Sequence, residues 1–231
     1  MNISNELRKE LIQNGASIAG FADLYSIPEK VRQGFAYGIS IGIALNPHAV
    51  AKIEQGPNLE YYNEYRYANN LLNELAEHIA EFLLGKGFFA FPQTQSNVIV
   101  NPVNRRSVLP HKTVATLAGL GWIGKSTLLI TEKYGAAIRI SSVLTNANLE
   151  VEKKLKNPQC DDCFNCVNVC PAKAISGKVW SKTTDRDELI NASACKNEVM
   201  ERGINLKLTD GTCGLCMWVC PWTQKYLRKG V

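Results

Sequence analysis

The feature that most constrains this chain is the placement of its eight cysteines, all of which lie between residues 160 and 220. The first 159 residues contain none, whereas a disulfide-rich secreted domain distributes its cysteines over the whole fold. The array comprises Cys160-x₂-Cys163-x₂-Cys166-x₃-Cys170-Pro171, an isolated Cys195, and Cys213-x₂-Cys216-x₃-Cys220-Pro221. This spacing is typical of thiolates that bind two [4Fe–4S] clusters.

The spacing also predicts which cysteines share a cluster. Cysteines two residues apart wrap one face of a cubane, because the tight turns between them point successive thiolates inward. The cysteine that precedes a proline opens a helix and reaches the other cluster. Two crossed sets follow. The first cluster takes Cys160, Cys163, Cys166 and Cys220; the second takes Cys170, Cys195, Cys213 and Cys216.

Zinc and structural thiols are the alternatives to clusters. A zinc site needs four ligands in two pairs, and it has no use for a third cysteine two residues further on or for two Cys-Pro pairs. The array therefore favours clusters over both alternatives. We further expect Trp218 and Trp222, which flank Cys220, to shield the first cluster from solvent.

The net charge of +5 invites a nucleic-acid interpretation, which the charge distribution weakens. Residues 151–231 hold 13 basic and 9 acidic side chains, a net of +4. Eight thiolates and two oxidised cluster cores add about −4 there, so the loaded protein is near neutral. The chain also lacks a basic stripe interleaved with aromatic residues, and we expect no nucleic-acid partner.

Hydrophobic periodicity predicts an α+β protein, with an α/β domain over residues 1–152 and a small ferredoxin-like domain over residues 153–231. Helices are expected at 4–13, 58–86 and 111–118, and strands at 16–22, 37–45, 88–91 and 98–100. A hairpin is expected from 127–131 and 136–145, turning at Tyr134-Gly135. The polar N-terminus is not a secretory signal, and the longest apolar run is too short to span a bilayer. We expect a cytoplasmic protein without membrane association.

A glycine-rich segment, AGLGWIGKST at residues 118–127, matches both the P-loop pattern and the dinucleotide-binding fingerprint. Both motifs need a strand before the loop and a helix after it, because the helix N-terminus binds phosphate. Here the upstream residues are helical in pattern and the downstream residues are β-branched. We therefore reject both nucleotide motifs. The simplest remaining role is a tight turn that packs Trp122 into the core.

AGLGWIGKSTLLIT, followed by the cysteine array, resembles the epoxyqueuosine reductase family, which is related to corrinoid reductive dehalogenases. The resemblance is good over roughly residues 105–222 and loose before them. It implies a cobalamin cradled by the α/β domain and electrons that pass from an external donor, of the ferredoxin or flavodoxin type, through both clusters to cobalt. The cofactor-binding residues that it implies lie in and just before the glycine-rich segment: His111, Lys112, Gly119, Gly121, Trp122, Gly124, Lys125 and Ser126.

The chain departs from this family in two places. The reductases carry an aspartate, thought to donate a proton, about thirteen residues before AGLGW, where this chain reads Asn104-Arg105-Arg106-Ser107. The family also continues past the clusters into a region implicated in tRNA binding, whereas this sequence ends eleven residues after Cys220. The resemblance therefore predicts the redox architecture and not tRNA as substrate.

Three side chains are candidate acid–base residues. His111 precedes the glycine-rich segment and could donate a proton or contact the cofactor. Tyr62 and Tyr65 belong to an aromatic run near cationic Arg66, and a tyrosine paired with a cation serves as a general acid in related corrinoid chemistry. The alternatives are a structural role at the start of a helix for His111 and aromatic packing for both tyrosines.

Three functions remain open on the sequence alone. The chain is a cobalamin-dependent iron–sulfur oxidoreductase acting on a small molecule, or an electron carrier that reduces a corrinoid on a partner protein, or a ferredoxin-type carrier without a corrinoid.

Overall fold

The computed structural model describes residues 2–101, 106–151, 158–181, 183–204, 206–208 and 213–230. Contacts divide the chain into two compact units, each assembled from three stretches. Unit 1 comprises residues 1–43, 68–121 and 139–155, and unit 2 comprises residues 44–67, 122–138 and 156–231. The predicted domain boundary after residue 152 stays a prediction. The cluster-binding residues form one compact unit with two earlier stretches, residues 44–67 and 122–138.

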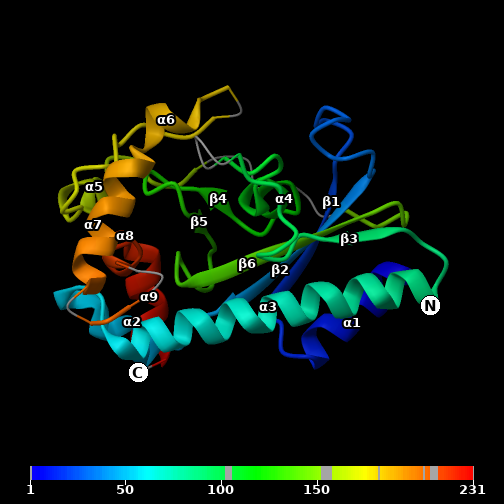
Figure 1. The fold of residues 1–231 in the computed structure, drawn as a ribbon, viewed down its shortest axis with the longest axis horizontal. Coiled ribbons are helices and arrows are strands. Elements are labelled where there is room, and N and C mark those ends of the chain that lie inside the picture. Colours follow the sequence, from blue (N-terminus) through cyan, green and yellow to red (C-terminus); the bar gives the residue numbers. More distant parts are fainter. Residues whose placement is uncertain are drawn as a thin grey trace. The chain divides into compact units, whose positions relative to one another are not determined.

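Unit 1 is built on a four-stranded sheet with the order β1-β2-β6-β3. The strands are β1 (Ile18–Asp23), β2 (Tyr37–Ala44), β3 (Ala90–Pro92) and β6 (Ile138–Thr145). β1 pairs antiparallel with β2, and β3 pairs antiparallel with β6. Helix α1 (Ile3–Gln13) and residues 68–85 of α3 (Leu59–Gly85) lie along one face (Figure 1). A contact of 2.7 Å between His78 Nε2 and Glu10 Oε1 joins these two helices.

Helix α4 (His111–Leu117) packs against β1 on the other face of the sheet (Figure 1). Two strand glycines permit this approach. A Cβ atom at Gly20 would lie 2.8 Å from Leu120 Cδ2, and one at Gly38 would lie 2.8 Å from Val114 Cγ1. Val114 belongs to an apolar cluster whose members are almost fully buried. The end of α4 and residues 118–121 therefore have a fixed place on the sheet.

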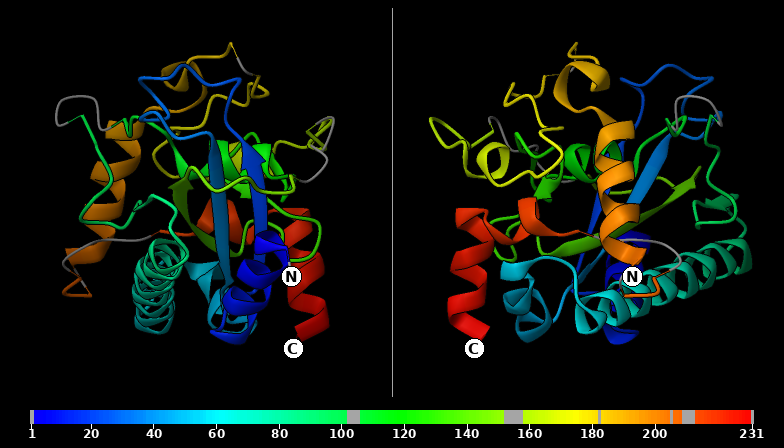
Figure 2. Two further views of the ribbon diagram at one scale, coloured as in Figure 1. Left: turned by 90° about the vertical axis from the view of Figure 1, so that its right-hand side faces the viewer. Right: turned by 60° about the vertical axis from the view of Figure 1, so that its left-hand side comes forward.

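Unit 2 carries the cysteine array on short helices. Its elements are α2 (Pro47–Ala51), η1 (Lys52–Gln55), β4 (Trp122–Ile123), β5 (Leu129–Ile130), α5 (Asn165–Asn168), α6 (Arg186–Leu189), α7 (Ala192–Ile204), α8 (Leu215–Trp218) and α9 (Pro221–Gly230), with residues 59–67 of α3. α9 lies beside α2, as Figures 1 and 2 show. α8 contacts η1.

The structure confirms the α+β class and most of the predicted elements, and it corrects two of them. Residues 98–100 do not form a strand; Val100 makes only an isolated bridge to Ser107. The predicted hairpin is also wrong, because β5 pairs with β4 while β6 joins the large sheet. Only the tip of the predicted hairpin closes, through reciprocal backbone hydrogen bonds of 2.9 Å between Thr131 and Gly135. In the described part of the chain, no helix is long and apolar enough to cross a membrane.

Candidate iron–sulfur site

Two similar short helices carry the paired halves of the array. Cys166 is the second residue of α5 and Cys216 is the second residue of α8. Each helix is followed by a valine at its C-cap and then by a Cys-Pro pair. α5 packs directly against α8. The two cysteine groups therefore approach each other, as a crossed ligand arrangement requires.

The environment of Cys166 shows which thiols gather with it. Burial raises the pKa of the Cys166 thiol to about 11, and the thiols of Cys160, Cys163 and Cys220 raise it further. Burial also raises the pKa of Cys220, with Cys160 and Cys163 adding to the effect. These four cysteines are the set predicted for the first cluster, and the fold brings them together.

The second predicted set gathers in the same way. Burial raises the pKa of Cys216 to about 12, and Cys213, Cys195, Cys166 and Cys170 contribute in that order. All four cysteines of this set line one pocket, with walls of apolar side chains that include Ile175 and Ile190. Cys166, a member of the first set, also raises the pKa of Cys216, so the two sets are neighbours.

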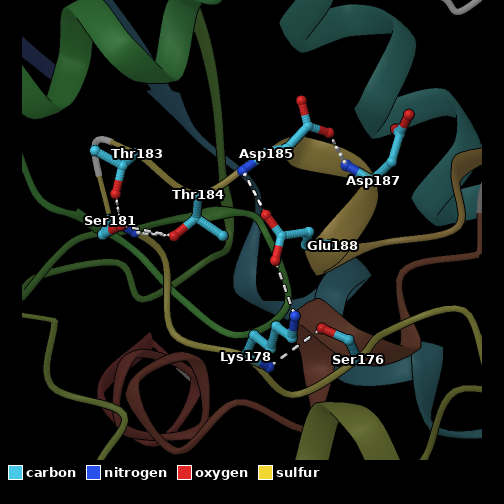
Figure 3. A network of polar contacts seen from close by, with 8 residues as sticks. All are labelled: Ser176, Lys178, Ser181, Thr183, Thr184, Asp185, Asp187 and Glu188. Carbon is cyan, nitrogen blue, oxygen red and sulfur yellow. Dashed lines mark hydrogen bonds and ion pairs between the residues drawn. The ribbon is translucent and has the colours of Figure 1, made fainter.

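A folded loop delivers Cys195 to this pocket. Ile175 bridges Ile190 in an antiparallel pair, which brings the loop back beside Cys170 before α7 begins. Helix α6 closes the loop with a capping box: the Asp185 carboxylate accepts from the Asp187 N–H at 2.8 Å, and the Glu188 carboxylate accepts from the Asp185 N–H (Figure 3). Glu188 also pairs with Lys178 at 2.9 Å. The folded loop thus brings Cys195 to the other three cysteines of its set, although it lies far from them in the sequence.

Backbone N–H groups solvate the sulfur atoms. The Cys220 sulfur accepts from Thr223 and Trp222 at the start of α9, which lowers a pKa that burial raises overall. Cys170 Sγ accepts from the Ala174 N–H at 3.3 Å. Such donors stabilise thiolate charge and tune the potential of a bound cluster. Eight thiolates in two neighbouring sets fit two [4Fe–4S] clusters by number and donor type.

The predicted cobalamin-binding residues fall into both compact units. Gly119 ends α4 with φ of +71°, and the N–H groups of Gly119 and Leu120 donate to the carbonyls of Thr116 and Ala115. This is the glycine-dependent cap of a helix C-terminus. Lys112 lies in α4, where its carbonyl accepts from Thr116 Oγ1 at 2.8 Å. Gly121 is buried at the end of this stretch.

The rest of the predicted set belongs to unit 2, and its side chains are buried there: Trp122, Lys125 and Ser126. The ring of Trp122 meets that of Trp222 edge-on, with centroids 5.0 Å apart. A Cβ atom at Gly124 would collide with the Ile130 side chain and lie 3.4 Å from Cys160 Sγ. β5 follows the turn, so the structure supports the rejection of both nucleotide motifs. These residues pack against the cluster segment, and their contact with a corrinoid stays a prediction.

His111 is half-buried in unit 1, where its ring hydrogen-bonds to a chain of two polar side chains. Its Nδ1 lies 2.8 Å from Ser142 Oγ, and Ser142 Oγ donates to Gln93 Oε1 at 2.6 Å. Since the hydroxyl proton goes to Gln93, the Ser142 oxygen accepts from Nδ1–H and leaves Nε2 with its lone pair. Burial, with the nearby Arg139 charge, lowers the pKa of His111 to about 4. At neutral pH this imidazole is uncharged and offers an acceptor at Nε2.

The two candidate tyrosines lie on α3 in unit 2. Tyr62 is buried, and the Arg66 guanidinium carbon lies 5.8 Å from its ring centroid. Tyr65 is half-buried and meets Tyr61 edge-on at 6.5 Å. The aromatic packing and the cation contact that the sequence suggested are both present. Their role as acids stays a prediction.

Sequence reasoning missed two features of the site. The Lys125 ammonium reaches the cluster loop 36 residues downstream, a contact that no local pattern signals. Ser142 and Gln93 fix the His111 ring, although they lie in separate strands or loops and carry no motif. Both depend on tertiary packing.

Comparison with known proteins places the fold. Residues 159–223 match the family described as "4Fe-4S double cluster binding domain". An epoxyqueuosine reductase of Synechocystis is 31% identical over 52% of this chain and 42% of its own length. A tetrachloroethene reductive dehalogenase of Desulfitobacterium hafniense is 30% identical over 68% of this chain and 28% of its own. A solved reductive dehalogenase superposes with a TM-score of 0.71 at 16% identity, covering 97% of this chain and 32% of that one.

The chain spans about half, or less, of the length of the curated relatives that it matches. The predicted resemblance to the epoxyqueuosine reductase-like family is nevertheless confirmed, in both its reductase and its dehalogenase branch. This protein is therefore an iron–sulfur protein with a 4Fe–4S double-cluster domain, related to epoxyqueuosine reductases and reductive dehalogenases.

Proposed function

We propose that this protein is an oxidoreductase that passes electrons from an external low-potential donor, of the ferredoxin or flavodoxin type, through two [4Fe–4S] clusters to a bound cobalamin, for the reduction of a small molecule. The observation that carries the proposal is the crossed grouping of the cysteines. Cys220 joins the first set from the second half of the array, and Cys170 joins the second set from the first half.

The crossed sets support electron transfer rather than storage of single metal ions. α5 and α8 pack together, and the thiol of Cys166 lies close enough to raise the pKa of Cys216. Clusters held by these ligands are neighbours, so an electron that enters at one reaches the other over a short distance.

Support for cobalamin comes from the relatives and from His111. One superposable structure is described as suggesting a mechanism for B12-dependent dehalogenation. Cobalamin, when bound, supplies a cobalt centre of low potential for reductive chemistry. In this chain, the neutral His111 ring offers a fixed acceptor at Nε2, suited to a polar group of a cofactor or substrate. The resemblance also implies contacts from Trp122, Gly124 and Lys125, whose burial and packing in unit 2 leave such contacts a prediction.

A second candidate is an electron carrier that reduces a corrinoid on a partner protein. The sequence contains no aspartate or glutamate between Glu81 and Glu132, the region where the reductases carry their proton-donating carboxylate. An electron carrier does not protonate a substrate, so it has no need of this carboxylate. The missing acid therefore favours electron delivery over substrate reduction. A ferredoxin-type carrier without corrinoid is the third outcome of the test below.

Anaerobic EPR of the iron-reconstituted protein, with and without added cob(II)alamin, tests the proposal. We expect two reduced-cluster signals and a shift of the cobalt signal to the base-off form. Turnover with a small substrate then separates the oxidoreductase from the carrier. An unshifted cobalt signal beside two intact clusters would leave the corrinoid-free carrier, and fewer than two clusters would refute the ligand assignment itself.

A further inference from the structure

Lys125, at the end of the glycine-rich turn, reaches the loop that carries the first three ligands of the first cluster. Its side chain is buried, with 5% of the residue's surface exposed. The ammonium donates to the backbone carbonyl oxygens of Asp161 at 2.6 Å and Cys163 at 3.2 Å. It also lies 3.7 Å from the centroid of the Phe164 ring. Three contacts join one lysine to this loop, which comprises residues 160–166.

The charge of Lys125 lacks an anionic partner within the described residues. A buried ammonium is costly unless another charge compensates it. Carbonyl dipoles and an aromatic face supply part of that compensation. Four thiolates around an oxidised cluster core carry a net charge of about −2, and reduction adds one more negative charge. The loaded cluster therefore supplies the counter-charge that the polypeptide does not.

The backbone on both sides of this contact is constrained. Thr127 has φ of +63°, an unusual conformation for a β-branched residue, and Asp161 has φ of +34°. The Thr127 N–H donates to the Gly124 carbonyl at 2.8 Å, which closes the turn that directs Lys125 inward. Strained backbone of this kind persists where the surrounding structure fixes it. Here the lysine is the link between the two strained positions.

We propose that Lys125 is a positioning residue of the first cluster: it orders the 160–166 loop for cluster binding, and its buried charge raises the reduction potential of that cluster. The effect involves no bond-making. Because the reduced cluster is more negative than the oxidised one, a nearby cation stabilises the reduced form more. The inference rests on the cluster assignment of the proposed function.

The test compares Lys125→Met, which removes the charge at similar length, with Lys125→Arg, which keeps it. Lys225→Met is the matched control, since the Lys225 ammonium lies 5.3 Å from the Trp222 ring, near Cys220, but is exposed. Redox titration followed by EPR gives the potential of each cluster in the holoprotein, and iron release to a chelator gives cluster retention.

In Lys125→Met we expect the first cluster to become at least tenfold harder to reduce, about 59 mV for a one-electron couple, and to release iron faster. The second cluster, the arginine variant and the Lys225 control should resemble the wild type. A methionine variant with wild-type potential and iron release overturns the inference.

Loss of the first cluster can prevent a titration of Lys125→Met. Retention of both clusters in Lys125→Arg then supports the inference. Loss of the first cluster from both variants, or of both clusters from Lys125→Met, overturns it. If the wild type holds two clusters and Lys125→Met matches it in potential and iron release, this inference alone is refuted. If the wild type holds fewer than two clusters, the proposed function is refuted.

Discussion

At the scale of single residues, burial suppresses the charge of titratable side chains in each unit. Burial raises the pKa of Cys166 and Cys216 far above the range of free thiols. Cluster binding converts these thiols to thiolates and releases their protons. Burial likewise keeps His111 neutral. Ligand exchange and protonation at these positions give the most direct tests of the assignment.

Cys170→Ser should remove the second cluster and leave most of the first, because Cys170 belongs to the second set despite its place beside Cys166 in the sequence. The expected iron content falls from about eight to about four atoms per chain. Cys160→Ser is the matched variant, and it should remove the other EPR signal. Loss of the same signal from both variants would show that the crossed sets are wrong.

His111 should make stability depend on pH in the mildly acidic range. Its folded pKa of about 4 lies below the unfolded value of 6.5, so only the unfolded chain takes up a proton between these values. This contribution to the free energy of unfolding is fully present above pH 6.5 and falls by about 3 kcal/mol as the pH drops to 4. Anaerobic urea unfolding across this range measures the slope.

His111→Gln should flatten this slope, whereas His48→Gln should leave it unchanged, because His48 is exposed. Equal slopes in the wild type and the His111 variant would remove His111 as the cause.

At the scale of elements, the start of α9 makes a tightly constrained contact within unit 2. Gly135 has φ of +57°, and a Cβ atom there would collide with the backbone of Thr223 and lie 2.5 Å from the Trp222 carbonyl carbon. The Ala136 N–H donates to Thr223 Oγ1 at 3.0 Å. The tip of the 131–135 turn thus sets the position of α9, and with it that of Cys220.

Gly135→Ala should destabilise the protein by roughly 2–4 kcal/mol, from the left-handed φ and the backbone collision together. The first cluster should then lose iron faster than the second. Gly85→Ala is the control, because a Cβ atom there meets nothing within 4 Å and its φ is not positive. Equal stability of the two variants in chemical unfolding would contradict this account of the α9 contact.

At the scale of the whole molecule, unit 2 is discontinuous in sequence. α9 packs on α2, α8 contacts η1, and the Tyr226 hydroxyl donates to the Leu45 carbonyl at 2.8 Å. Lys125 and Gly124 support the cluster loop from a third stretch. The cluster segment therefore depends on two earlier stretches of the chain, residues 44–67 and 122–138.

A fragment comprising residues 153–231 should bind clusters less stably than the full chain, because it lacks the two supporting stretches at 44–67 and 122–138. Iron content and the rate of iron loss to a chelator measure the difference, with the full chain as reference. Equal retention would show instead that the domain boundary predicted after residue 152 is also a folding boundary.

The sequence by itself determined what depends on local spacing. The cysteine intervals indicated two clusters, apolar periodicity located α1 and α3, and Pro110 marked the start of α4, because these signals lie within a few residues of chain. The glycine-rich segment was also correctly separated from nucleotide motifs, since the pattern after it is extended. The resemblance to the epoxyqueuosine reductase-like family came from the same short motifs.

Only the tertiary structure decided how distant stretches combine. It paired β5 with β4 rather than β6, because a two-residue strand takes whichever neighbour packing offers. It also turned Lys125 toward the cluster loop and fixed His111 through Ser142 and Gln93. These contacts join residues about 30 to 50 positions apart, and burial and charge across such separations leave no periodic trace in the sequence.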